Sequence, residues 1–374
     1  MRAVIRIRKQ HIERHHTAHS TRHRSTEQHR PAGRATLSIL LAALGLVAAA
    51  CGSNTATNAS ATTGSATAES PARTGAALSL TLYTSVTQNT VDSVVAGFKA
   101  AHPGSNVTVF RATTGALNAR LAADQRTGGV RADVVWGTDP LSMQSYAAQQ
   151  LLRSHPIALP PNVPAKYATD ALYPTRLLYL VIVARKGLTA LPTTWSDLAS
   201  PAYRGKVAIP DPAAAGSALA ALGYFAQAPG YGMDFYRRLK ANGAVQVATI
   251  PEVVTDVAQG RYALGISLDS QVRSAQSAGS PVQIVWPKPG AITLYSPIAV
   301  TSASKNADAA GAFLRYVLST DAQRRIAATG WQPVLPGIPG PPIPAGAGQV
   351  TANWPNLFGH QHDLLGEYQS IFGL

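Results

Sequence analysis

From residue 78 onward, two kinds of hydrophobic pattern alternate along the chain. Short apolar runs predict β-strands, and segments whose apolar residues recur every three or four positions predict helices. The predicted strands are 80–83, 107–111, 133–136, 177–184, 206–209, 262–267, 282–286 and 297–300. The predicted helices begin near Val91, Thr113, Pro140, Ser217, Pro251 and Asn306, and a last one covers 364–372. This alternation predicts an α/β fold in which mostly parallel sheets are flanked by helices.

A different pattern precedes this periodic region. A basic segment is followed by an apolar run from Leu37 to Ala50 and then by Cys51, which is the order of a secretory signal peptide over 1–50 with a long basic n-region. The run is shorter than the ~20 apolar residues that span a bilayer. Residues 53–75 are almost entirely Ser, Thr, Ala, Asn and Gly. Since they offer too little apolar surface to offset chain entropy, we expect a flexible tether over 51–77.

Cys51 is the only cysteine of the chain, so no internal disulfide can form. The segment Ala48-Ala-Ala-Cys-Gly-Ser53 resembles the lipobox of bacterial lipoproteins, in which the cysteine is linked to diacylglycerol and becomes the new N-terminus. Lipoboxes prefer Leu where this chain has Ala48, and ordinary signal cleavage is the alternative. We expect a protein that is exported by the general secretory route and anchored through Cys51 on the extracytoplasmic face of the cytoplasmic membrane.

The charge of the chain is concentrated at its start. The 374 residues carry a net charge of +14, which on its own would suggest a nucleic-acid or membrane partner. The first fifty residues contribute half of that excess, with nine Lys and Arg against two Glu. Because half of the excess lies in the predicted signal peptide, we expect no nucleic-acid partner. The length allows two ordinary domains.

Several short segments follow one another in a specific order between residues 78 and 336. They are Leu80-Thr-Leu-Tyr-Thr-Ser85, Thr113-Thr-Gly115, Ala132-Asp-Val-Val-Trp-Gly137, Thr194-Trp-Ser-Asp-Leu198, Tyr203-Arg-Gly-Lys206, Ile209-Pro-Asp-Pro212, Ala263-Leu-Gly-Ile266, Ala278-Gly-Ser-Pro-Val282 and Ser304-Lys-Asn306. With these segments the chain resembles the periplasmic-binding-protein superfamily of type 2 topology. The resemblance is to the branch that holds ferric-iron, thiamine, phosphonate and phosphorylated-sugar receptors.

The resemblance implies two lobes that close on a solute and are joined by a hinge of crossing strands. Lobe 1 would comprise 78–175 and 297–374, and lobe 2 would comprise 176–296. Such a protein is a monomeric receptor without catalysis and without a cofactor. It would capture a small, anionic or zwitterionic solute and deliver it to an ABC permease and its ATPase.

The candidate ligand-binding residues lie where the resemblance places the cleft between the lobes. Gly115 and Gly216 stand at helix starts, where unpaired N–H groups and the helix dipole favour an anion, although these are also ordinary capping positions. Asp269 follows a strand and either pairs with a ligand amine or caps a helix. Tyr295 either contacts the ligand or belongs to the core. The full set is Ser85, Thr113, Thr114, Gly115, Gly137, Thr138, Gly216, Ser217, Asp269 and Tyr295.

Two departures from the resembled branch bear on the ligand. Ferric-iron receptors of the branch have a Tyr-Tyr pair after the Gly-Ile strand, where this chain reads Gly265-Ile-Ser-Leu-Asp-Ser-Gln271. Direct iron binding is therefore disfavoured, and a ferric-iron or iron-chelate receptor stays an alternative. Phosphonate receptors have a Ser-Ser-Gly-Thr turn, where this chain has Ala214-Ala-Gly-Ser217. The loss of two hydroxyls weakens the expectation of a phosphonate ligand.

Motifs for catalysis and for metal binding are incomplete in this sequence. Ser302-Ala-Ser-Lys305 matches the Ser-x-x-Lys motif of penicillin-recognising enzymes without its partner motifs, and Ser267 stands in an incomplete nucleophile elbow. A secreted serine hydrolase and a surface adhesin or scaffold are the alternatives to a receptor. His360-Gln-His362 lacks a third ligand at a known metal spacing, so no metal site is expected.

Overall fold

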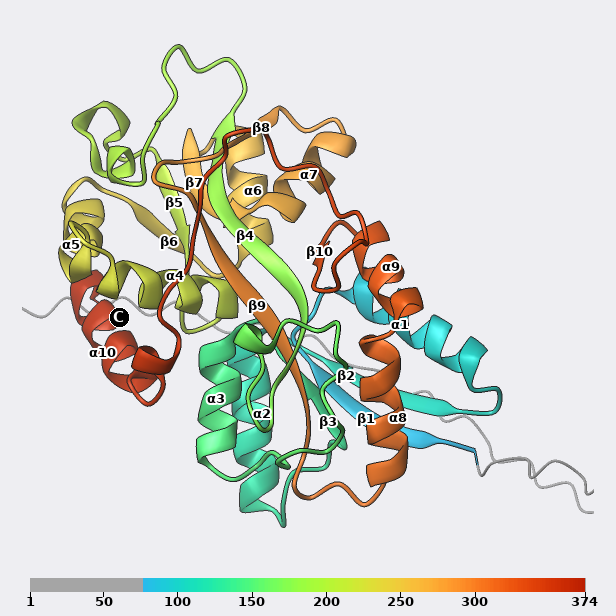
Figure 1. The fold of residues 1–374 in the computed structure, drawn as a ribbon. Helices are drawn as coiled ribbons and strands as arrows, with labels where there is room; N and C mark the ends of the chain where they lie inside the picture. The colour runs from blue at the N-terminus through green and yellow to red at the C-terminus, as the bar shows by residue number, and fades with distance from the viewer. Residues whose placement is uncertain (1–76, 374) are drawn as a thin grey trace, which may run out of the picture. The chain divides into compact units, whose positions relative to one another are not determined.

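The computed structural model describes residues 77–373 (Figure 1). The predicted signal peptide over 1–50, Cys51 and nearly all of the predicted tether lie outside the described residues. Within 77–373, no helix combines the length and the apolar character that a membrane crossing needs.

The first six elements alternate as the sequence predicts. They are β1 (Ser79–Thr84), α1 (Gln88–Ala101), β2 (Asn106–Arg111), α2 (Thr114–Arg126), β3 (Val134–Trp136) and α3 (Pro140–Ala148). Strand β1 lies between β2 and β3 and pairs in parallel with both. Helix α3 begins after Asp139 because the Asp139 carboxylate accepts a hydrogen bond from the Ser142 amide and Pro140 fits the first turn.

A second set of parallel strands and helices follows later in the chain. Its elements are β5 (Val207–Pro210), α4 (Gly216–Gln227), α5 (Gly232–Ala241), β6 (Val245–Val247), α6 (Ile250–Gln259), β7 (Leu264–Leu268), α7 (Asp269–Ser277) and β8 (Val282–Val285). Strand β5 pairs in parallel with β6 and β7, whereas β8 lies outside this parallel group. Short 3₁₀ turns cover 165–167, 196–199, 201–203 and 355–357.

Two long strands, β4 (Tyr173–Arg185) and β9 (Ala291–Val300), connect the two parallel sets. They pair with each other in antiparallel register and give the order β2-β1-β3-β9-β4-β7-β5-β6. In Figure 1 they run side by side through the middle of the fold. The predicted bounds 177–184 and 297–300 were too short, because both strands continue through polar residues that the tertiary structure buries.

The last elements of the chain pack on both groups of strands and helices. They are α8 (Ala307–Val317), α9 (Thr320–Ala328), β10 (Gln332–Pro333), β11 (Gln349–Val350) and α10 (Gln361–Phe372). Helices α8 and α9 lie against α1, whereas α10 packs mainly on α5 and α4 and also contacts α3. The lobe boundaries stay a prediction, and these contacts favour a second lobe that includes α10 as well as 176–296.

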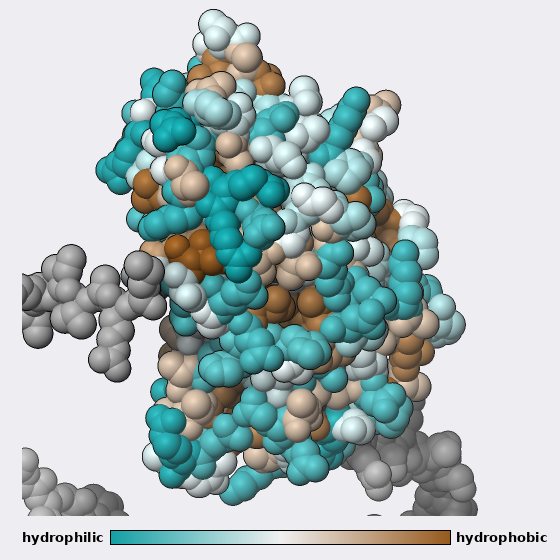
Figure 2. All heavy atoms as spheres, turned by 90° about the vertical axis from the view of Figure 1, so that its left-hand side faces the viewer, coloured by the Kyte–Doolittle hydropathy of each residue, from teal (hydrophilic) through white to brown (hydrophobic). Residues whose placement is uncertain are grey.

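Apolar side chains cover both sides of the sheet. The rings of Phe98 and Phe313 meet between α1 and α8 with their centroids 5.1 Å apart, and those of Phe225 and Phe235 meet between α4 and α5 at 4.3 Å. Asn306 occupies the position before α8, as predicted, but its amide donates to the Asp133 carboxylate instead of capping the helix. Figure 2 shows the face that carries α5 and α10, where hydrophilic residues prevail and apolar patches are small and separate.

Candidate ligand-binding site

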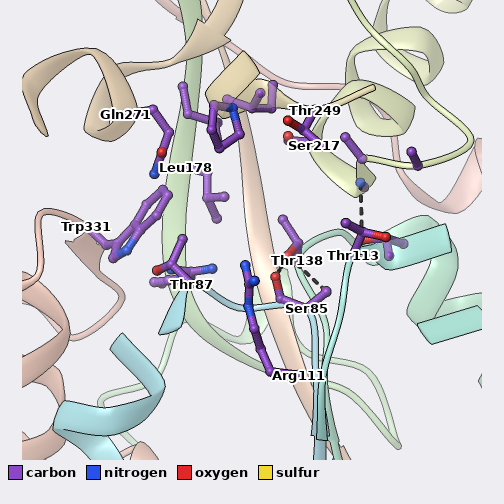
Figure 3. A pocket seen from close by; sticks show the side chains of 18 residues that line it. Ser85, Thr87, Arg111, Thr113, Thr138, Leu178, Ser217, Thr249, Gln271 and Trp331 are labelled. Atoms are coloured by element: carbon purple, nitrogen blue, oxygen red, sulfur yellow. Dashed lines mark hydrogen bonds between the residues drawn. The ribbon is translucent and has the colours of Figure 1, made fainter. Parts of the chain in front are cut away.

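The candidate site is a cavity beside β4, and the first residues of α2 and α4 line it together on one side (Figure 3). Its volume is about 110 Å³, which suits a small solute. Both parallel sets and β4 contribute to the lining. The lining residues are Ser85, Thr87, Arg111, Thr113, Thr114, Thr138, Arg176, Leu178, Ala214, Ala215, Gly216, Ser217, Thr249, Ile250, Pro251, Leu268, Gln271 and Trp331.

The structure brings many of the predicted site residues to this cavity. Those that line it are Ser85, Thr113, Thr114, Thr138, Gly216 and Ser217. Those outside the lining are Gly115, Gly137, Asp269 and Tyr295. The hydroxyls of Ser85 and Thr138 are hydrogen-bonded to each other at 3.0 Å in the lining of the cavity (Figure 3). The role of the predicted residues in ligand binding stays a prediction.

The two predicted anion-binding helix starts are hydrogen-bonded to each other. The Gly115 amide donates to the Ala214 carbonyl at 3.2 Å. The Gly216 amide donates to the Thr114 hydroxyl, also at 3.2 Å (Figure 3). The Thr113 hydroxyl accepts a hydrogen bond from the Ala116 amide and so caps α2. These contacts hold α2 against α4, and the Gly115 and Gly216 amides are already satisfied without a ligand.

Asp139 lies behind this junction and was missed by the sequence reasoning. Its side chain is fully buried, and its Oδ2 atom has no hydrogen-bond partner among residues 77–373. Burial raises the pKa of Asp139 to about 6, and the hydrogen bond from Ser142 opposes that shift. A side chain at position 216 would collide with it, because a Cβ there would lie 2.1 Å from the Asp139 Oδ2.

Three of the remaining predicted residues lie in the packed interior. Asp269 is the first residue of α7, and its carboxylate accepts a hydrogen bond from the Arg273 Nε at 3.3 Å. Burial raises the pKa of Asp269, although Arg273 opposes the shift. Tyr295 is buried on β9 with its ring 5.4 Å from that of Tyr167, and burial raises its pKa as well. The Gly137 amide donates to a β9 carbonyl.

Two cationic side chains of the cavity were also missed. Arg111 ends β2, donates from Nε to the Val86 carbonyl at 3.0 Å, and points into the cavity in Figure 3. Arg176 lies on β4 and is only 1% exposed. Neither Asp nor Glu occurs among the described residues that line the cavity. A signal for Arg176 was present, since a charged residue directly precedes the apolar run that begins at Leu177.

The serines weighed for catalysis lie elsewhere. The Ser302 hydroxyl is exposed and donates to the Gln150 carbonyl at 2.8 Å. Ser267 is fully buried in β7, and its hydroxyl donates to the Leu268 carbonyl at 3.5 Å. Neither lines the cavity. In the described part of the chain, no group of three or more His, Cys, Asp or Glu residues is placed to hold a metal ion.

The sequence is similar to transport-related binding proteins. Residues 80–332 match the family described as bacterial extracellular solute-binding protein. The chain is 27% identical over 144 residues to the spermidine/putrescine-binding periplasmic protein of Escherichia coli, which covers 37% of this chain and 41% of that protein. The chain therefore spans only about two fifths of the length of such relatives.

Solved structures share the fold over most of their length. The periplasmic binding protein AfuA from Actinobacillus pleuropneumoniae, with exogenous fructose-6-phosphate bound, has a TM-score of 0.71 and 18% identity, covering 79% of this chain and 98% of that one. Iron-bound HitA from Pseudomonas aeruginosa has a TM-score of 0.68 and 18% identity, covering 79% and 100%. These likenesses confirm the predicted two-lobe α/β fold of the periplasmic binding proteins. Because the family match extends over most of the described residues, the chain belongs to the bacterial extracellular solute-binding proteins.

Proposed function

We propose that this solute-binding protein captures a small anionic or zwitterionic solute in the cavity between α2, α4 and β4, outside the cytoplasmic membrane. The observation that carries the proposal is the lining: two arginines and several hydroxyls face the cavity, and the lining residues include no carboxylate. Such donors complement a carboxylate or a phosphate group. The protein would then deliver the solute, as a monomer, to an ABC permease and its ATPase.

The lining residues also argue against the cationic ligands that some similar proteins bind. A polyamine such as the ligand of the Escherichia coli relative is a cation, and carboxylates are the natural partners of its ammonium groups. Ferric iron needs hard oxygen ligands such as phenolates or carboxylates. Among the described lining residues there is neither a tyrosine nor an acidic residue. The cavity therefore favours an anion such as a phosphate ester over either cation.

Thermal unfolding with and without added solutes tests this proposal. At a ligand concentration of 100 times Kd, binding stabilises the folded state by about 2.7 kcal/mol, which raises the Tm by roughly 5–10 °C. We expect such a shift with glycerol phosphate and not with spermidine or with glycerol. Protein purified with ferric iron should lack the visible phenolate-to-iron absorption band. Stabilisation by spermidine, or a stoichiometric coloured iron complex, would contradict the proposal.

The proposal includes no catalysis. Neither Ser267 nor Ser302 donates its hydroxyl to a general base, and both donate to backbone carbonyls instead. A covalent serine probe should therefore label neither residue. Labelling of one serine at a stoichiometric level would revive the hydrolase alternative.

We further propose that Cys51 is lipidated and that the mature protein is anchored to the membrane. The support is the position of this single cysteine directly after the apolar run 37–50. Two acyl chains anchor a protein stably, whereas one binds only marginally. We expect the wild type to partition into detergent and Cys51→Ser to be released or to stay unprocessed. Recovery of the wild type entirely in the soluble secreted fraction would refute the anchor.

A further inference from the structure

Arg176 is a buried cation without a counter-ion among the residues that the structure describes. Its Nε and Nη1 atoms are buried and have no hydrogen-bond partner among residues 77–373. None of the salt bridges of the described chain includes it. Burial lowers its pKa to about 9, so the side chain is still cationic at neutral pH. A buried charge that lacks a partner destabilises the protein, and an anion bound beside it would remove that penalty.

The surrounding structure fixes Arg176 at the edge of the cavity. The register between β4 and β9 shifts between Pro174 and Arg176, and such bulges redirect side chains next to binding sites. The backbone at the bulge is held on both sides. The Thr175 hydroxyl donates to the Ser296 carbonyl at 2.7 Å, and the Gln323 amide donates to the Thr175 carbonyl at 2.8 Å.

Two neighbours of Arg176 in the lining are apolar. The guanidinium carbon lies 4.1 Å from the ring centroid of Trp331, and the Trp331 Nε1 donates to the Thr90 hydroxyl at 3.0 Å, which fixes the ring. Leu178 is two residues further along β4 and therefore on the same face of the strand. In this part of the cavity the Arg176 guanidinium therefore lies beside two apolar lining side chains. Figure 3 labels these two residues, Leu178 and Trp331.

We propose that Arg176 determines the ligand: its guanidinium pairs with the anionic group of an organic solute, whose apolar part lies against Leu178 and Trp331. The inference rests on the proposed function, which requires only that an anion bind somewhere in the cavity. The sequence placed the anionic group of the ligand at the starts of α2 and α4, but the Gly115 and Gly216 amides there are already hydrogen-bonded. The inference places that group at Arg176 on β4 instead. It also makes a bare inorganic ion the weaker ligand.

The test compares purified wild-type protein with Arg176→Met and Arg176→Lys. The probes are phenyl phosphate and glycerol phosphate, with inorganic phosphate as the bare anion and phenol and glycerol as uncharged counterparts. We expect calorimetry to show that Arg176→Met weakens binding of phenyl phosphate by about 100-fold, because a charge-assisted bidentate pair is lost. Arg176→Lys keeps the positive charge but loses the planar pair of N–H donors, and it should therefore retain part of the affinity. Inorganic phosphate should bind the wild type more weakly than phenyl phosphate.

The unliganded variants distinguish a ligand-selecting role from a structural one. Arg176→Met should unfold at the same temperature as the wild type or a higher one, because it removes an unpaired buried charge. If Arg176→Met unfolds at a lower temperature than the wild type and Arg176→Lys does not, the arginine serves to hold Trp331 in place. The inference would then be wrong. Arg126→Met changes the net charge equally on the exposed end of α2 and should leave binding unchanged.

The remaining outcomes separate the inference from the proposed function. Wild type that binds phenyl phosphate while Arg176→Met binds it equally well overturns the inference and leaves the anion receptor intact. Inorganic phosphate that binds as tightly as phenyl phosphate overturns the organic part of the inference. Wild type that binds none of these anions at millimolar concentration contradicts the proposed function itself.

Discussion

Replacement of Gly216 by valine is expected to weaken ligand binding by about 100-fold while the fold stays intact. A Cβ at position 216 would lie 2.1 Å from the Asp139 Oδ2 and 2.8 Å from the Thr114 hydroxyl oxygen. Both atoms belong to the junction that holds α2 and α3 against α4, so the larger side chain must push these helices apart. Gly216 lacks a left-handed φ, and the clash alone carries the effect. Overpacking of this kind costs on the order of 1–3 kcal/mol. If a cost of about 2.7 kcal/mol falls on the arrangement that binds the ligand, the affinity drops about 100-fold.

Calorimetric titration with a phosphate ester that the wild type binds measures the loss of affinity. Circular dichroism of the free protein checks that the fold is intact. Gly366→Ala on α10 is a matched control, because no atom lies within 4 Å of the Cβ that it would add. The control should bind like the wild type. If Gly216→Val also binds like the wild type, the contact between α2, α3 and α4 does not shape the cavity.

Replacement of Asp139 by asparagine is expected to stabilise the protein at alkaline pH and to leave it unchanged at acid pH. Burial raises the pKa of Asp139 from 3.8 to about 6. The polar groups around it are the Ser142 amide, which donates to Oδ1, the Leu141 amide and the Ser142 hydroxyl. The Thr114 hydroxyl lies across the junction, and the phenols of Tyr146 and Tyr295 are close enough to interact with its charge. No cation among them favours the charged carboxylate.

The direction of the pH dependence follows from the two protonation states. The folded protein binds the Asp139 proton more tightly than the unfolded chain, so the stabilising contribution is complete below pH 4 and is lost as the pH rises through 6. Each pH unit between the two pKa values is worth about 1.4 kcal/mol, so the loss amounts to ~3 kcal/mol. Asparagine stays neutral and can still accept the Ser142 hydrogen bond that caps α3.

Urea unfolding at pH 4 and at pH 8 measures the difference. Asp139→Asn should exceed the wild type by up to ~3 kcal/mol at pH 8 and match it at pH 4. Asp92→Asn on the exposed face of α1 removes the same charge and should not differ from the wild type at either pH. A stability gain of Asp139→Asn that persists unchanged at pH 4 would show that relief of a buried charge is not its cause.

Local sequence determined the order of the elements and many of their ends. Helix α6 shows why: Thr249 caps it by accepting the Glu252 amide, Pro251 fits its first turn, and Gly260 ends it with a φ of +79°. These signals act within a few residues and need no tertiary contact. The alternation of apolar strands and amphipathic helices likewise pointed to the parallel sets and, through the resemblance, to the two-lobe fold.

Tertiary structure decided the extent of the crossing strands and the chemistry of the cavity. Strand β4 begins at Tyr173 because Thr175 and Arg176 are buried by β9, α9 and Trp331, which are distant in sequence. Gly115 and Gly216 were expected to offer free amides, yet the fold places the first opposite the Ala214 carbonyl just before α4 and the second opposite the Thr114 hydroxyl on α2. Whether a polar group is buried and whether it has a partner depend on segments that meet only in the folded chain. For this reason the sequence, through the resemblance, named six residues that line the cavity, and only the folded structure showed Arg176, which has no partner among residues 77–373, beside them.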